Sequence, residues 1–300
     1  MTVALRKAAA DIRRLPGVIG VFDGLHRSQR AVHVHVDRRG GAGPFPSKIE
    51  GHPLRVTRCS LPEAQAVDIK DALWQSGGSA PRESTITCIL RQGNRLFVLG
   101  SGHGMLPYAS NNLLALSFDH QQHSAPVNVT IFDGSGGFYR GRLLWGRLAG
   151  GSALDYGLMR LTQISDADYD DWHGAVSGFP PYPASADAVR VGDDVWHLSR
   201  FANRPNRIMG KVSKLALSTT DITLPDGRVG KYANVIVVRG TNTQRFSERG
   251  ESGSLIVNSA QRVIGTIVGG TGSESYVLPI KPLIRALAAQ NFDLMLREVS

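Results

Sequence analysis

The sequence predicts a mainly β protein whose N-terminal part forms a smaller unit of mixed helix and strand. Its 34 glycines and 15 prolines suit short strands joined by many turns. From residue 82 onward, short apolar runs recur with turn residues between them, which is typical of a sandwich or a pair of barrels. Hydrophobic residues make up 42% and charged residues 20% of the chain, as in a globular domain.

The N-terminal part, residues 1–75, is expected to fold as a small α+β domain. Leu5, Ala8 and Ile12 lie near one face of an amphipathic helix that Pro16 ends. The elements expected here are a helix over residues 3–15, strands over 18–22 and 31–36, and a second helix over 62–74.

The stretch over residues 76–81 has the composition of a linker, and residues 82–300 are expected to form the β domain. Apolar residues at helical spacing after Pro282 predict a C-terminal helix. Strands are expected over residues 84–90, 95–99, 127–132, 138–145, 156–161, 194–198, 207–217, 232–238, 254–257 and 263–268.

The net charge of +9 comes from Lys and Arg residues that are scattered along the chain, so nucleic acid is not expected as a partner. Cys59 and Cys88 lie in apolar runs and are expected to be buried free thiols. The N-terminus lacks the apolar core of a signal peptide, and no stretch reaches the roughly 18 apolar residues that would span a bilayer. We therefore expect a cytoplasmic protein with no membrane span.

The other histidines do not predict a metal site. His33 and His35 share one face of an alternating strand, which favours a surface or a packed interface. His120 and His123 have no partner carboxylate or cysteine motif and are expected in a solvated loop. We therefore expect no cofactor.

Three segments carry residue types that cooperate in nucleophilic catalysis. His103 follows a strand-like run, Asp155 opens another, and Ser252 lies in the turn Gly-Glu-Ser-Gly-Ser before a third. A serine hydroxyl becomes a good nucleophile when an imidazole takes its proton, and a carboxylate orients that imidazole. Gly250 and Gly253 let the turn bend so that the N–H groups of Gly250 and Ser252 converge on an oxyanion. Each residue alone fits an ordinary turn or strand end, but jointly they predict a catalytic triad.

These motifs resemble those of the trypsin/chymotrypsin superfamily of serine proteases. Gly-Glu-Ser-Gly-Ser is similar to that family's Gly-Asp-Ser-Gly-Gly and to the Gly-Asp-Ser-Gly-Ser of bacterial members. The run 262–270 resembles the strand that lines the substrate cleft, so Val268, Gly269 and Gly270 would contact substrate. The resemblance covers residues 82–298 and implies a double six-stranded β-barrel that hydrolyses peptide bonds. The N-terminal unit resembles an appendage found before protease domains in some bacterial and plant proteins.

The sequence departs from the family in three places, one of which is that no cysteine flanks the specificity loops. Glu251 stands where the family has aspartate, and a glycine follows His103 where digestive members have cysteine; both changes fit an intracellular bacterial-type member. Alignment of the motifs puts the floor of the primary pocket near Phe246 and its far wall near Glu274. A buried Glu274 would favour Lys or Arg in the substrate, whereas a pocket floored by Phe246 would favour small or hydrophobic residues. Both specificities stay open.

The sequence thus predicts a serine endopeptidase that acts on a specific intracellular protein or peptide. The alternative is an inactive or latent form of the same fold that serves as a protein-binding module. In either case the N-terminal domain leaves room for a regulatory partner.

Overall fold

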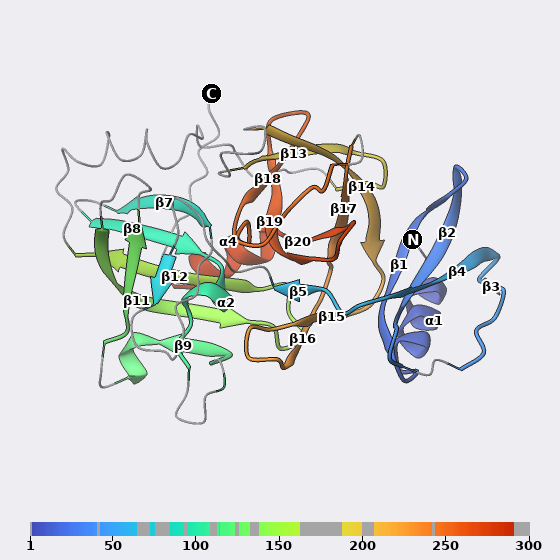
Figure 1. Ribbon diagram of the computed structural model, residues 1–300, viewed down its shortest axis with the longest axis horizontal. Coiled ribbons are helices and arrows are strands. Elements are labelled where there is room, and N and C mark those ends of the chain that lie inside the picture. The colour runs from blue at the N-terminus through green and yellow to red at the C-terminus, as the bar shows by residue number, and fades with distance from the viewer. Residues whose placement is uncertain are drawn as a thin grey trace.

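The structure is a computed structural model. It describes residues 2–40, 43–64, 73–75, 85–92, 95–108, 113, 115–123, 126–132, 138–162, 188–199, 207–241 and 244–290. The expected linker over residues 76–81 lies outside this part of the chain. Strands dominate the described residues, and the predicted mainly β class is confirmed (Figure 1).

The N-terminal unit is a helix packed against a small sheet. Its elements are α1 (Val3–Arg13), β1 (Val18–His26), β2 (Gln29–Asp37), β3 (Lys48–Ile49) and β4 (His52–Cys59). The Thr2 hydroxyl accepts the Leu5 N–H at 3.3 Å and caps α1, whose Leu5, Ala9 and Ile12 are buried. The predicted alternation of β2 is confirmed: its valines face α1, and its histidines face the rest of the molecule.

The middle of the chain forms a seven-stranded antiparallel sheet. The strand order is β6-β10-β11-β12-β8-β7, with β9 also paired to β11. The strands are β6 (Leu73–Gln75), β7 (Ile86–Gln92), β8 (Arg95–Gly100), β9 (Ser117–Asp119), β10 (Asn128–Phe132), β11 (Phe138–Leu148) and β12 (Asp155–Leu161). The short helices α2 (Gly102–Met105) and η1 (His120–Gln122) follow β8 and β9.

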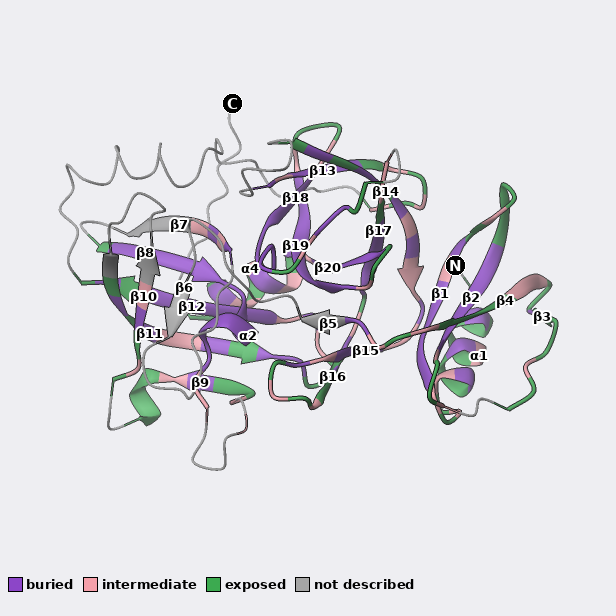
Figure 2. Ribbon diagram, viewed as in Figure 1, coloured by how far each residue is buried: buried purple, intermediate pink, exposed green. Residues whose placement is uncertain are grey.

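The C-terminal part forms a closed barrel of six antiparallel strands, because the pairing runs β13-β14-β17-β20-β19-β18 and returns to β13. These strands are β13 (Asp194–Leu198), β14 (Arg207–Ala216), β17 (Ile236–Gly240), β18 (Leu255–Asn258), β19 (Val263–Gly270) and β20 (Ser275–Pro279). Figure 2 shows that β19 is buried along its length. The hairpin of β15 (Thr220–Thr223) and β16 (Val229–Tyr232) and the helix α4 (Ile280–Ala288) complete this part.

The expected second helix over residues 62–74 is wrong in the residues described there. Glu63–Ala64 form strand β5, which pairs with β15 and β19, and Leu73–Gln75 form strand β6, which pairs with β10. Pairing with distant strands overrides the weak helical pattern, because local propensity is a small term beside tertiary contacts.

The N-terminal unit joins the barrel in two ways: β1 pairs with β14 in one continuous sheet, and a buried ionic cluster lies beside that seam. Lys214 of β14 contacts Glu274 and lies 3.0 Å from Nε2 of His35, whose Nδ1 lies 3.2 Å from the Tyr276 hydroxyl. Arg239 also binds the Glu274 carboxylate, at 2.6 Å. Burial and the Lys214 charge lower the pKa of His35 to about 3, so the imidazole is neutral near pH 7. The expectation of a packed interface at this histidine is confirmed.

Candidate active site

The site is built where β8 and β12 lie side by side. Gly100 at the end of β8 pairs with Gly157 of β12, and α2 begins two residues later. A Cβ on Gly102 would stand 2.7 Å from the Arg147 carbonyl and 2.9 Å from Oδ1 of Asp155. Only glycine lets α2 approach β12 this closely, and that approach carries the next residue, His103, to the start of β12.

His103 and Asp155 are joined by two hydrogen bonds. The His103 N–H donates to Oδ1 of Asp155 at 2.9 Å, and Nδ1 of the ring lies 2.6 Å from Oδ2. Since a carboxylate only accepts, Nδ1 carries the hydrogen, and Nε2 is the ring atom that can accept a proton. Both side chains are buried, which holds the imidazole in one orientation and one tautomer.

A buried tyrosine that the sequence did not indicate lies beside Asp155. Burial, followed by the negative charge of Asp155, raises the pKa of Tyr232 well above its ordinary value, so the phenol stays neutral. Tyr232 ends β16, and nothing in the local sequence connects it to the motif at Asp155. Tyr232 is therefore a neutral neighbour of the carboxylate and does not cancel its charge.

Ser252 lies in a turn that needs glycine on both sides. Gly250 and Gly253 have φ angles of +96° and +95°, a region that side chains rarely adopt. A Cβ on Gly253 would stand 2.3 Å from the Thr85 carbonyl. The Thr85 hydroxyl donates to the Gly250 carbonyl at 2.7 Å, and the Thr85 N–H donates to the Ser252 carbonyl at 2.9 Å. Thr85, which sequence reasoning missed, therefore holds the turn from both ends.

The serine turn and the histidine helix meet at the ends of β7 and β8. The Ser101 nitrogen stands 3.4 Å from where a Cβ on Gly253 would be, so the two backbones are in contact. The Ser252 hydroxyl donates to the Val268 carbonyl at 3.3 Å. Ser252 and His103 each have 0% of their surface exposed. The structure thus gathers the three residues of the predicted triad in one buried region.

Glu251 is anchored inside the barrel. Its carboxylate accepts the Glu248 N–H at 2.8 Å and the hydroxyl of Ser199. His197 lies 3.9 Å from the same carboxylate and binds the Phe246 carbonyl at 2.6 Å. Side chains of the barrel therefore stabilise the serine turn through Glu251.

The residues expected to bind substrate lie in different environments. The Phe246 ring is 1% exposed and packs on His197 in the barrel core, 4.9 Å between centroids. Glu274 is held by Lys214 and Arg239 in the ionic cluster. Val268, Gly269 and Gly270 form the end of β19 beside the serine turn.

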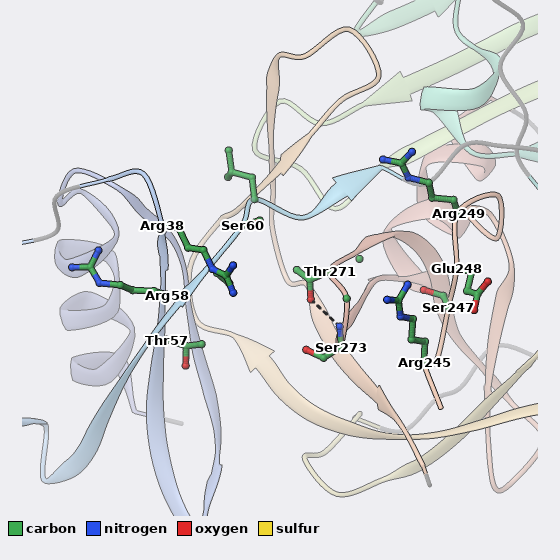
Figure 3. A pocket seen from close by; sticks show the side chains of 14 residues that line it. Arg38, Thr57, Arg58, Ser60, Arg245, Ser247, Glu248, Arg249, Thr271 and Ser273 are labelled. Atoms are coloured by element: carbon green, nitrogen blue, oxygen red, sulfur yellow. Dashed lines mark hydrogen bonds between the residues drawn. The ribbon is translucent and has the colours of Figure 1, made fainter. Parts of the chain in front are cut away.

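A cavity of about 630 Å³ opens between the N-terminal unit and the barrel (Figure 3). Four arginines and one glutamate line it together with several hydroxyl groups, so its charge is positive. These charged residues are Arg38, Arg58, Arg245, Arg249 and Glu248, and Gly270 also lines the cavity. The cavity adjoins both the serine turn and the end of β19.

Within the described residues no cluster of three His, Cys, Asp or Glu side chains could hold a metal ion, and no helix there is long and apolar enough to cross a membrane. Burial raises the pKa of the Cys59 thiol to about 11 and that of Cys88 to about 12. Both cysteines are free thiols, as predicted, but both are half-buried and not fully buried as expected; they stay protonated near neutral pH.

No family model and no curated protein matches the sequence. Among solved structures, the chain is similar to the active form of the Rv3671c protease from M. tuberculosis, with 14% identity, a TM-score of 0.44 and coverage of 77% of this chain and 91% of that one. The inactive form of that protease is similar at 14% identity with a TM-score of 0.41, and the match covers 73% of this chain and 87% of that one. Deg5 is similar at 14% identity with a TM-score of 0.34, and the match covers 63% of this chain and 75% of that one. Identity this low transfers no site residue, so roles for His103, Asp155 and Ser252 depend on their own geometry.

Proposed function

We propose that this protein is a serine endopeptidase with Ser252 as nucleophile, His103 as general base and Asp155 as the residue that orients His103. The observation that carries the proposal is the pair of hydrogen bonds from His103 to Asp155, which directs Nε2 of the ring away from the carboxylate. A histidine held in this tautomer can take a proton from a serine hydroxyl.

The reaction would proceed in two steps. The Ser252 Oγ attacks the carbonyl carbon of a peptide bond while its proton passes to Nε2 of His103. The N–H groups of Gly250 and Ser252 stabilise the oxyanion, and His103 then gives the proton to the leaving amine. Water, deprotonated by His103, hydrolyses the acyl-enzyme and regenerates Ser252. No step requires a cofactor.

The proposal includes the organisation of the chain. Residues 1–75 would form a regulatory domain that a partner can engage, residues 76–81 a linker, and residues 82–300 the protease domain. The last two strands of the first segment, β5 and β6, pair with β19 and β10 of the protease domain and so connect the two. Two free thiols with raised pKa values agree with a reducing compartment and support a cytoplasmic location.

Active-site labelling tests the nucleophile directly. A fluorophosphonate reacts only with a serine that a neighbouring base activates, so we expect slow labelling of the native protein and none of Ser252→Ala or of heat-denatured protein. Mass spectrometry of the labelled peptide identifies the modified residue. Labelling that survives in Ser252→Ala would contradict the assignment.

A second candidate function, a latent or inactive module that binds protein, is favoured by one observation. Ser252 and His103 are fully buried in this conformation, so a substrate cannot reach them without rearrangement. This candidate predicts no labelling of the native protein under any condition that preserves its fold.

The arginine-lined cavity favours substrates with an acidic residue near the cleaved bond, because four arginines face one glutamate there. We expect faster cleavage of a Glu-containing peptide than of its Lys-containing twin, and Arg245→Glu is expected to lower that ratio by about tenfold. Arg95→Glu makes the same change of net charge at an exposed position of β8 and serves as the control. An equal fall in both variants would rule out a role for the cavity.

A further inference from the structure

Strand β5 occupies the free edge of the barrel at the end of β19. Ala64 pairs with Gly269 and Glu63 with Gly270, both in antiparallel register. On its other side, Glu63 pairs with Thr223 of β15, and the Thr223 N–H donates to the Pro62 carbonyl at 2.7 Å. Two residues from the N-terminal part of the chain are therefore inserted between two strands of the C-terminal part (Figure 1).

This edge lies directly beside the proposed nucleophile. The Ser252 hydroxyl donates to the Val268 carbonyl, and Val268 immediately precedes Gly269, the partner of Ala64. Neighbouring strands lie about 4.8 Å apart, so β5 passes one strand spacing from the segment that binds Ser252.

An extended peptide must bind close to Ser252 if its backbone is to be cleaved there. The end of β19 is suited to bind such a peptide by adding it as a strand, since Gly269 and Gly270 bring no side chains that would hinder its approach. In this structure β5 already has that position and that antiparallel register. Ser252 and His103 also have no exposed surface, which is the state expected when the approach to the nucleophile is closed.

The β5 segment is tethered to the rest of the N-terminal unit. Ser60, Leu61 and Pro62 connect it directly to β4, which pairs with β2, and β2 carries His35 into the ionic cluster with Lys214. The N-terminal unit is itself fixed to the barrel, because β1 pairs with β14, so β5 is held on β19 both by its own pairing and by a short connection to a unit of the same sheet.

We propose that β5 is an intramolecular pseudo-substrate strand: it occupies the peptide-binding edge of β19 and keeps the protein latent until it is displaced. This inference rests on the proposed function of Ser252. The main chain of residues 63 and 64 takes the place of a substrate on this edge, and an extended peptide substrate competes with that strand for the same edge.

Ala64→Pro tests the proposal, with Ala64→Ser as the matched control. Proline lacks an N–H, and its ring does not fit in a strand that has neighbours on both sides, whereas serine keeps the backbone unchanged. We expect Ala64→Pro to raise both the rate of fluorophosphonate labelling and the rate of casein cleavage by about tenfold, because proline removes the single N–H of residue 64 and its ring crowds the neighbouring strands. Ala64→Ser should behave as the native protein.

A cysteine pair tests the same inference in the opposite direction. Directly opposed residues of an antiparallel pair have Cα atoms about 4.5–5.5 Å apart, within the range for a disulfide. In a chain whose native cysteines are serine, Ala64→Cys with Gly269→Cys should be labelled and should cleave casein more slowly when oxidised than after reduction. Because Gly269 lies on the proposed peptide-binding edge, the comparison is made between these two redox states of the same protein and not with the native chain. This pair stays informative if Ala64→Pro does not fold, and the reduced form of the same protein is its control.

The outcomes separate the two proposals. Faster labelling of Ala64→Pro, or activity of the cysteine pair that rises on reduction, supports an inhibitory β5. Equal rates in the native protein and Ala64→Pro, or equal rates in the oxidised and the reduced pair, overturn that role while the assignment of Ser252 stands. No labelling of Ser252 in any of these folded proteins, including the reduced pair, overturns the proposed function and with it this inference.

Discussion

Replacement of Asp155 by asparagine should lower the rate of peptide cleavage by about 10⁴-fold while the protein stays folded. Asp155 accepts both the backbone N–H and the Nδ1 hydrogen of His103. An asparagine amide would keep the shape but can present its NH₂ group to Nδ1. That contact would move the ring hydrogen to Nε2, which then could not accept the serine proton.

The measurement compares initial cleavage rates of the two proteins and their thermal unfolding. Because β5 is proposed to restrain the native protein, the comparison should also be made in the Ala64→Pro background. Asp119→Asn is a suitable control, since it makes the same change of charge at a residue of β9 in the same sheet, where the Asp119 carboxylate caps the short helix η1. A loss of less than tenfold in Asp155→Asn would show that Asp155 does not orient the catalytic base.

Lys214→Met should destabilise the protein by about 3 kcal/mol or more, since removal of one partner from a buried ion pair leaves the other charge uncompensated. Lys214 and Glu274 are 4% and 5% exposed. Burial alone would raise the pKa of Glu274, yet Lys214, His35 and Arg239 together bring it below its usual value. Burial also lowers the pKa of Lys214. The cluster is therefore stable only when the charge of Lys214 and the charge of Glu274 are both present.

Urea unfolding measures this loss, and a double variant gives the control. Lys214→Met with Glu274→Met removes both buried charges, so it should recover much of the stability that Lys214→Met loses. If the single and double variants were equally unstable, the loss would come from packing and not from the charge of Glu274.

The local patterns that could be predicted are those in which a residue's role depends on its near neighbours. The helix α1, the alternation of β2 and the mainly β class follow from the spacing of apolar residues and from the turns. The glycines around Ser252 are needed for a positive φ, which is a property of the backbone at those positions alone. These features could be read without knowledge of any distant contact.

The environment of each residue predicted to bind substrate could not be predicted from local sequence patterns. Motif alignment put Phe246 and Glu274 at a specificity pocket, but the phenylalanine ring packs in the barrel core and the glutamate is held in the ionic cluster. Their partners come from β13 and β14, and no local pattern reports such pairings. The same reason applies to Thr85 and Tyr232, which contact the proposed triad from other strands.

By itself the sequence determined the mainly β class, the order of the three motifs of the proposed triad and the turn that carries Ser252. Only the tertiary structure decided that residues 63 and 64 form a strand on β19, that His35 closes an interface with Lys214, and that the proposed nucleophile is buried. The physical reason is that apolar spacing and backbone preference act over a few residues, whereas strand pairing and buried charge depend on segments that meet only when the chain folds.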